Sequence, residues 1–210
     1  TGELEMTLTS EPTSLVTITF TVADGALASV AGSPVVFSTS NYATARTVTV
    51  SAVEDAIDYA SPSTTVGVAV TADDAKYSAL VIADVDVDVT DNDVAAVDVP
   101  VTSATIIEDS GEIGFGLRLE TEPSSLVTLA LGTTAEVDIS PTSLTFSTSN
   151  YATMQTFSAT AVPNMLTHVP HPVISLTSTA SSSDGQYDTL TGTTISVTVT
   201  DDDTPGVNMS

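Results

Sequence analysis

Apolar and polar residues alternate along several short segments of the chain. The clearest case is residues 16–22, Val-Thr-Ile-Thr-Phe-Thr-Val, and the same period of two recurs in residues 47–50, 66–70 and 194–199. This period is typical of a β-strand with one buried face and one exposed face. A helical period of 3.6 residues is not sustained over any stretch of about ten residues. We therefore predict an all-β fold of short strands.

An eight-residue sequence, Phe-Ser-Thr-Ser-Asn-Tyr-Ala-Thr, occurs at residues 37–44 and again at residues 146–153. The flanking sequences repeat at nearly the same offset. The matching pairs are residues 11–17 with 122–128, 74–77 with 184–187, and 89–93 with 199–203. The chain therefore contains two copies of one module.

Each copy has roughly 100 residues, which is enough to bury a hydrophobic core. Short strands separated by Pro, Gly, Asn and Asp turns are typical of a seven-stranded sandwich. We predict two tandem immunoglobulin-like antiparallel β-sandwiches of about seven strands each. Module 1 covers residues 1–93 and has a truncated first strand, module 2 covers residues 94–203, and residues 204–210 begin a following module or a linker.

The chain carries 27 acidic residues against three basic ones, a formal net charge of -24. Nucleic acid is excluded as a partner, because neutralising phosphates requires clustered Lys and Arg. Anionic membranes are disfavoured for the same reason. No apolar run reaches the ~18–20 residues of a membrane-spanning helix. The absence of Cys excludes disulfides and thiol catalysis. The charge favours cations as ligands.

Each module closes with an acidic triplet after its last predicted strand. The triplets are Asp91-Asn92-Asp93 and Asp201-Asp202-Asp203. Adjacent carboxylates repel one another unless a hard cation lies among them, and Ca²⁺ accepts six to eight oxygen ligands. Oxygen-only ligation argues against zinc or copper. A solvated acidic turn is the alternative interpretation of either triplet taken alone.

The motifs of each module follow a fixed order. Glu-x-x-Gly-Glu comes first, then Phe-x-x-x-Asn-Tyr, a Val-x-Val strand followed by Glu54-Asp55, Asp-x-x-Tyr and a closing Val-Thr-Asp-Asn-Asp. This order resembles the Calx-β family, a Ca²⁺-binding β-sandwich found in sodium–calcium exchangers and in tandem arrays of extracellular proteins. The resemblance covers nearly the whole chain and implies Ca²⁺ as the cofactor.

The resemblance also implies where the ligands lie: a Glu in the first strand, an acidic residue before the Phe strand, an Asp pair after the next strand, and the closing triplet. Module 2 supplies Glu108, Glu136, Asp201, Asp202 and Asp203, but Pro163-Asn164 replaces the pair. Module 1 supplies Glu54, Asp55, Asp91 and Asp93, but Leu27 stands at the second position and the first lies outside the sequence. We therefore expect partial Ca²⁺ sites with a structural role.

Three further features have two interpretations each. Asp84, Asp86 and Asp88 share one face of a strand, either to protect a sheet edge or to contact a neighbouring chain, ion or glycan. Four tyrosines at matching positions either pack in the core or form a sugar-stacking platform; they are Tyr42, Tyr77, Tyr151 and Tyr187. The remaining feature is the pair His168 and His171, spaced to hold a metal, although the chain has no other His and no Cys to complete a site.

Nucleophilic catalysis requires an activated nucleophile beside an oriented base, and the sequence offers no such pattern and no Gly-rich phosphate loop. We expect a non-catalytic protein, not an enzyme. It would be a structural or adhesive unit of an extracellular tandem array or cell-surface filament, with Ca²⁺ stiffening the module ends. Its partners would be neighbouring modules of the same or identical chains, and glycans are a further option. The alternative is a carbohydrate- or protein-binding module of a larger secreted protein. Asn208 begins a glycosylation sequon.

Overall fold

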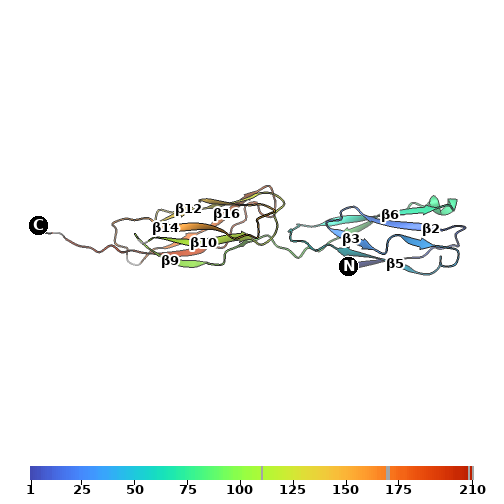
Figure 1. Ribbon diagram of the computed structural model, residues 1–210, viewed down its shortest axis with the longest axis horizontal. Coiled ribbons are helices and arrows are strands. Elements are labelled where there is room, and N and C mark those ends of the chain that lie inside the picture. Colours follow the sequence, from blue (N-terminus) through green and yellow to red (C-terminus); the bar gives the residue numbers. More distant parts are fainter. Residues whose placement is uncertain (110, 169–170, 208, 210) are drawn as a thin grey trace. The chain divides into compact units, whose positions relative to one another are not determined.

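The computed structural model describes residues 1–210 except 110, 169–170, 208 and 210. The sequon at Asn208 therefore lies outside the described residues. The chain divides into two compact units (Figure 1). Unit 1 is Thr1–Asp55 with Tyr59–Asn92, and unit 2 is Ala56–Asp58 with Asp93–Ser210. No helix among the described residues is long and apolar enough to cross a membrane.

Unit 1 is a sandwich of two antiparallel sheets, with strand orders β1-β5-β3 and β4-β2-β6-β7. Its strands are β1 (Gly2–Met6), β2 (Val16–Val22), β3 (Ala28–Ala31), β4 (Val35–Phe37), β5 (Arg46–Ala52), β6 (Ser63–Ala72) and β7 (Val85–Asp88). One short helix, α1 (Ala75–Ser78), follows β6. The unit has the predicted seven strands.

Unit 2 repeats this arrangement with ten strands among the described residues. They are β8 (Val97–Asp98), β9 (Ser103–Ile107), β10 (Glu112–Leu119), β11 (Val127–Leu131), β12 (Val137–Ser140), β13 (Ser143–Phe146), β14 (Gln155–Ala161), β15 (Val173–Leu176), β16 (Ser178–Ser182) and β17 (Ile195–Thr200). The sheet orders are β12-β14-β10-β8, β13-β11-β16 and β15-β17-β9. The number exceeds seven because the counterpart of β6 is split into β15 and β16, and because β8 and β9 precede β10.

The alternation of apolar residues gives each unit its core. Along β2, Val16, Ile18 and Phe20 are buried while the threonines between them are half-buried or exposed. In unit 2, the rings of Phe115 and Phe157 stack with their centroids 5.4 Å apart. The period of two therefore places one face of each strand in a sandwich core, as predicted.

The repeated octapeptide is a strand end followed by a turn. Phe37 and Phe146, its first residues, are fully buried. The turn is closed by an Asn side chain, because Ser38 N donates to Asn41 Oδ1 and Ser147 N to Asn150 Oδ1, both at 2.6 Å. The octapeptide is thus scaffold, and it fixes the alignment of the two units.

The Asp-x-x-Tyr motif forms a second repeated turn. Thr13 N donates to Asp74 Oδ2 at 2.9 Å, and Ser124 N donates to Asp184 Oδ2 at 2.7 Å. The hydroxyl of buried Tyr187 donates to Thr121 O at 2.8 Å, and burial raises its pKa. The predicted packing is therefore confirmed for Tyr77 and Tyr187, which are buried, while Tyr42 and Tyr151 are half-buried.

Candidate metal centre

Acidic side chains of unit 2 gather where two parallel strands end. β9 and β17 pair in parallel, so their carboxyl ends lie at the same edge of the sheet. Glu108 follows β9, and the triplet 201–203 follows β17. Glu108 N donates to Thr200 O at 2.9 Å, which fixes the two ends side by side. Two segments more than 90 residues apart thus deliver carboxylates to one place.

Glu108, Asp201 and Asp202 each place one carboxylate oxygen within 4.8 Å of the others. Two oxygens bound to the same Ca²⁺ lie at most about 5 Å apart, so this spacing fits one ion. Glu108 is 2% exposed, the Asp201 side chain is 3% exposed, and Asp202 is exposed. This acidic cluster could therefore hold a metal ion with one side open to solvent.

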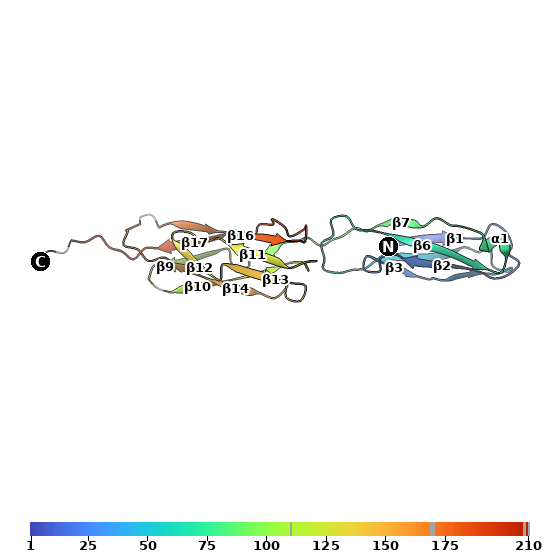
Figure 2. The same cartoon turned by 90° about the horizontal axis from the view of Figure 1, so that it is seen from above.

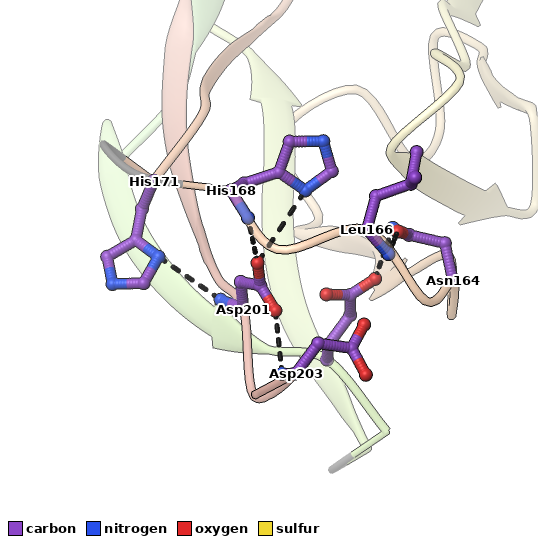
Figure 3. A network of polar contacts seen from close by, with 7 residues as sticks. Asn164, Leu166, His168, His171, Asp201 and Asp203 are labelled. Atoms are coloured by element: carbon purple, nitrogen blue, oxygen red, sulfur yellow. Dashed lines mark hydrogen bonds and ion pairs between the residues drawn. The ribbon is translucent and has the colours of Figure 1, made fainter. Parts of the chain in front are cut away.

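Asp201 is held by the loop that contains the two histidines (Figure 3). Its carboxylate accepts from His168 N and, at 2.7 Å, from Asp203 N. These donors, His168 N first, lower the pKa of Asp201. Asp201 N in turn donates to His171 Nδ1 at 3.2 Å. The histidines therefore help to position Asp201, and His171 Nδ1 is engaged in that hydrogen bond.

Two buried carboxylate oxygens at this end of the sheet have no hydrogen-bond partner among the described residues: Glu108 Oε2 of the cluster and Oδ2 of the neighbouring Asp203. The other Glu108 oxygen accepts from Asn164 Nδ2 at 2.5 Å. Burial raises the pKa of Asp203, and the charges of Asp201 and Asp202 raise it further. Leaving a buried polar atom without a partner raises the free energy of the folded state, and a bound cation would give these oxygens a partner.

A cavity of about 10 Å³ adjoins the cluster, which is room for roughly one water-sized sphere. Its polar lining comes from Glu108, Glu136, Asn164, His168 and Asp201. Glu136 is positioned by the backbone, since Val162 N donates to Glu136 O at 2.9 Å. The cavity therefore places a fourth predicted ligand, Glu136, near Glu108, Asp201 and Asp202.

The sequence did not indicate the role of Asn164. It occupies the position of an acidic residue in module 1, Asp55, and was expected only to remove charge. The structure shows Asn164 donating to Glu108 and accepting from Leu166 N at 2.6 Å. An amide can do both because it carries a donor and an acceptor. Its alignment with Asp55 was the one signal that could have placed it at the site.

The module 1 residues keep main-chain contacts equivalent to those of unit 2 but differ in their side chains. Leu27 is buried at the position of Glu136, as the equivalent hydrogen bond from Val53 N to Leu27 O at 3.0 Å shows. Asn92 Nδ2 donates to Glu54 Oε1 at 3.3 Å, and Tyr59 N donates to Asp91. Asp93 falls in unit 2.

Within the described part of the chain, the unit 2 cluster is the one group of three such side chains at ligand spacing. Ligation by the module 1 residues stays a prediction, and it concerns Glu54, Asp55, Asp91 and Asp93.

No protein-family model and no curated protein matches the sequence. Among solved structures, the chain aligns with the periplasmic chaperone SfaE at 9% identity and a TM-score of 0.42, covering 51% of this chain and 58% of that one. For the E. coli chaperone DraB the values are 9%, 0.36, 54% and 58%. For CBD12 from CALX1.2 they are 10%, 0.32, 85% and 73%.

The likeness is to immunoglobulin-like β-sandwich folds. The chain spans little more than half the length of the two chaperones. With identities near one tenth and TM-scores below 0.5, these alignments carry no argument about function.

Proposed function

We propose that the chain is a non-catalytic repeat unit of an extracellular structural or adhesive protein, with Ca²⁺ bound at the end of a module. The proposal draws on the duplicated module, the strongly acidic composition and the acidic cluster of unit 2. It also draws on the order of motifs that resembles Calx-β modules.

One observation carries the metal-binding part of the proposal. Glu108 is almost fully buried, its Oε2 has no hydrogen-bond partner among the described residues, and one of its carboxylate oxygens lies within 4.8 Å of oxygens of Asp201 and Asp202. A solvated acidic turn would not bury a carboxylate in this way, because burial without a partner is unfavourable. A bound cation would give that oxygen a ligand.

The donor set favours Ca²⁺ over other common ions. Every candidate ligand atom of the cluster is a carboxylate oxygen, which suits Ca²⁺ and not zinc or copper. The exposed position of Asp202 leaves space for water molecules, which Ca²⁺ accepts as ligands. With few protein ligands, affinity would fall in the range of extracellular modules, roughly 10⁻⁴–10⁻³ M.

The position of the cluster supports a structural role. A cation among these carboxylates would hold the end of β9 to the end of β17 and would order residues 201–203. Tandem modules form quasi-one-dimensional arrays, so order at a module end stiffens the connection to the next element. The long-array hypothesis predicts rod-shaped particles in electron micrographs of the native protein, and globular particles would refute it.

Carbohydrate binding is less favoured. The chain has five Phe, five Tyr and no Trp. Each of these ten residues is described, and none is exposed. Sugar stacking requires an exposed aromatic face, which the described surface does not offer.

Isothermal titration calorimetry of the whole chain with Ca²⁺ tests the metal-binding proposal. We expect saturable binding that is lost or at least tenfold weaker in Glu108→Gln, and unchanged in Glu112→Gln, an exposed residue at the start of β10. Mg²⁺ should bind more weakly, because it requires stricter octahedral geometry. A flat Ca²⁺ titration of the unmodified chain would refute the proposal.

Extracellular exposure is a separate claim with a separate test. Antibodies raised against the chain should label intact source cells or their medium. Labelling that requires permeabilised cells would contradict the assignment while leaving Ca²⁺ binding intact.

A further inference from the structure

Unit 1 has an open cleft along one side, between β4 of one sheet and the start of β5 of the other. Its volume is about 550 Å³. It is lined by Gly32 and Pro34 of the turn between β3 and β4, by Val35 and Val36 of β4, and by residues 45–47. None of the residues that line the cleft is acidic, although the chain carries 27 acidic residues. The cleft can therefore accept an anion that most of this surface would repel.

Arg46 is the charged residue of the cleft. It begins β5, and it lies on the same face of that strand as Val48 and Val50, which are buried in the core. Glu5 pairs with Thr47, so its side chain lies on the opposite, outer face. Among the described residues, no hydrogen bond or ion pair engages the Arg46 guanidinium. Its five N–H donors are thus available to a ligand in the cleft.

Unit 2 shows how a side chain at this position can reach from one sheet to the other. The alignment of the repeated octapeptide matches Gln155 with Arg46 and Thr145 with Val36. β13 and β14 of unit 2 lie next to each other (Figure 2), and Gln155 Nε2 donates to Thr145 O at 2.6 Å between them. Among the residues described in unit 1, no such hydrogen bond joins Arg46 to Val36. Unit 1 therefore leaves both the donor and the acceptor of this contact unused.

The main chain of Val36 forms an open sheet edge beside Arg46. Phe20 N donates to Ser33 Oγ at 2.9 Å, so Phe20 and every second residue of β2 direct their main-chain groups toward β4. Ile18 is one of these residues, and its partner in β4 is Val35. The N–H and C=O of the next residue, Val36, therefore point away from β2. Because β4 is the last strand of its sheet, this edge can pair with one more extended segment.

We propose that this cleft binds an extended acidic peptide segment of a partner protein. The carboxylate of the segment pairs with Arg46, and its main chain pairs with Val36 at the edge of β4. A guanidinium forms two parallel hydrogen bonds with a carboxylate, which fixes the position of the acidic residue. Pro34 and Val36 are exposed, so the cleft also favours apolar side chains on either side of that residue. Strand addition of this kind draws affinity from main-chain hydrogen bonds and specificity from alternate side chains.

A polyanion such as a sulfated polysaccharide fits the cleft less well. Arg46 is the single basic residue in the lining, and the whole chain has a net charge of -24. Polyanions are bound by several basic groups together, and the negative field around this cleft repels each further anionic group. A segment with one acidic residue among apolar and uncharged residues forms the contact with Arg46 without that repulsion.

The probe is the synthetic peptide acetyl-Thr-Val-Thr-Asp-Thr-Val-Thr-amide, which places two Val and the Asp on one face of a strand. Nuclear magnetic resonance of the full chain should show saturable shifts of the Val36 amide and the Arg46 Nε–H, with a Kd on the order of 1 mM. The same peptide with Asn in place of Asp should bind at least about threefold more weakly, because it loses the ion pair. Raising the ionic strength from about 0.05 to about 0.5 M should weaken binding of the Asp peptide only.

Two variants of the chain separate the contact with Arg46 from a general effect of charge. Arg46→Gln gives unit 1 the residue that unit 2 has at this position, so the variant should fold, bind the Asp peptide at least about threefold more weakly and no longer prefer Asp to Asn. Arg118→Gln removes the same charge outside the cleft, where Arg118 pairs with Asp98 at 2.7 Å, and it should leave binding unchanged. The Asn peptide tests the same contact on the unmodified chain, so the test does not depend on the folding of a variant.

The proposal is overturned if the Asp peptide causes no shift at about 10 mM, or if the Asp and Asn peptides bind equally. It is also overturned if acetate binds at Arg46 as tightly as the peptide, because the edge of β4 then contributes nothing. Tighter binding of a sulfated polysaccharide at Arg46, or shifts of Val36 and Arg46 that grow with protein concentration alone, would assign the cleft to another occupant and overturn the proposal as well. The measurements are made in EDTA, so their result is independent of the Ca²⁺ proposal.

Discussion

Replacing Glu108 by Gln should stabilise the metal-free chain and abolish its stabilisation by Ca²⁺. In the metal-free protein, Glu108 is buried and its Oε2 lacks a hydrogen-bond partner among the described residues, while Asp201 and Asp202 place further carboxylates within 4.8 Å. A Gln side chain can still accept from Asn164 through its oxygen, and its NH₂ group can donate toward those carboxylates. The substitution thus removes both the unpaired acceptor and one repelling charge.

The magnitude follows from the cost of the unpaired atom and from mass action. A buried polar group without a partner costs about 1–3 kcal/mol, so the metal-free variant should gain roughly this much free energy of unfolding. For the unmodified chain, Ca²⁺ at one hundred times its Kd should add about 2.7 kcal/mol. At roughly 4 °C per kcal/mol for a unit of this size, Ca²⁺ should raise the Tm of unit 2 by about 10 °C.

Thermal unfolding measured by circular dichroism and calorimetry, with EDTA and with Ca²⁺, checks both statements. We expect the variant to unfold at a higher temperature than the unmodified chain in EDTA and to respond little to Ca²⁺. Glu112→Gln removes the same charge at an exposed site and should keep the full Ca²⁺ response. If Glu108→Gln lowers the Tm in EDTA and retains the Ca²⁺ response, then the Glu108 carboxylate neither destabilises the metal-free chain nor binds Ca²⁺.

Three further predictions follow from other contacts. Asn164→Asp should raise Ca²⁺ affinity, on the order of tenfold, and lower the Tm in EDTA, because it adds a negative charge beside Glu108. Calorimetric titration measures the affinity and thermal unfolding measures the Tm. An unchanged affinity would show that residue 164 does not contribute to Ca²⁺ binding. Tyr187→Phe should cost about 1–3 kcal/mol in unfolding by urea, because it leaves Thr121 N and Oγ1 without their partner; an unchanged midpoint would contradict this. The pKa of Asp74 in the folded chain is lowered, chiefly by the hydrogen bond from the N–H of Thr13. Between the folded and the unfolded pKa, the unfolded state therefore binds more protons than the folded state. The stability contributed by Asp74 is complete above the unfolded pKa of 3.8 and is lost as pH falls through the lower folded pKa. Asp74→Asn should therefore destabilise the chain at pH 7 and have little effect in strong acid, and an effect of equal size at both pH values would refute the linkage.

The strands could be predicted from the sequence because their cause is local. Alternation with period two places one face in the core, and the predicted residues 16–22 coincide with β2. The repeated octapeptide aligned the modules correctly, since the turns closed by Asn41 and Asn150 are the same. Because the two modules fold alike, the internal repeat gives a residue-by-residue alignment that a single module would not provide.

The site was less predictable because its contacts are not local. The proximity of Glu108 to Asp201 depends on the parallel pairing of β9 with β17, and alternation alone does not distinguish parallel from antiparallel partners. The hydrogen bond from Asn164 to Glu108 depends on the path of a loop, for which composition gives no geometry. The family resemblance indicated which acidic residues to consider, and the structure showed which of them lie close together and which residues form hydrogen bonds with them.

The difference between the two modules at this site has a physical rationale. Glu54 and Asp55 of module 1 correspond to Pro163 and Asn164, so these two positions carry two fewer negative charges in module 2. A site with many carboxylates binds cations tightly, but its carboxylates repel one another when no cation is bound. The amide of Asn164 instead donates a hydrogen bond to one oxygen of Glu108, which needs no ion. We therefore expect unit 2 to fold in EDTA and to gain stability from Ca²⁺ in moderation. Reversing the exchange with Pro163→Glu and Asn164→Asp together should make folding of unit 2 depend on Ca²⁺, and a double variant that unfolds at the same temperature with and without Ca²⁺ would show that these charges do not reach the site.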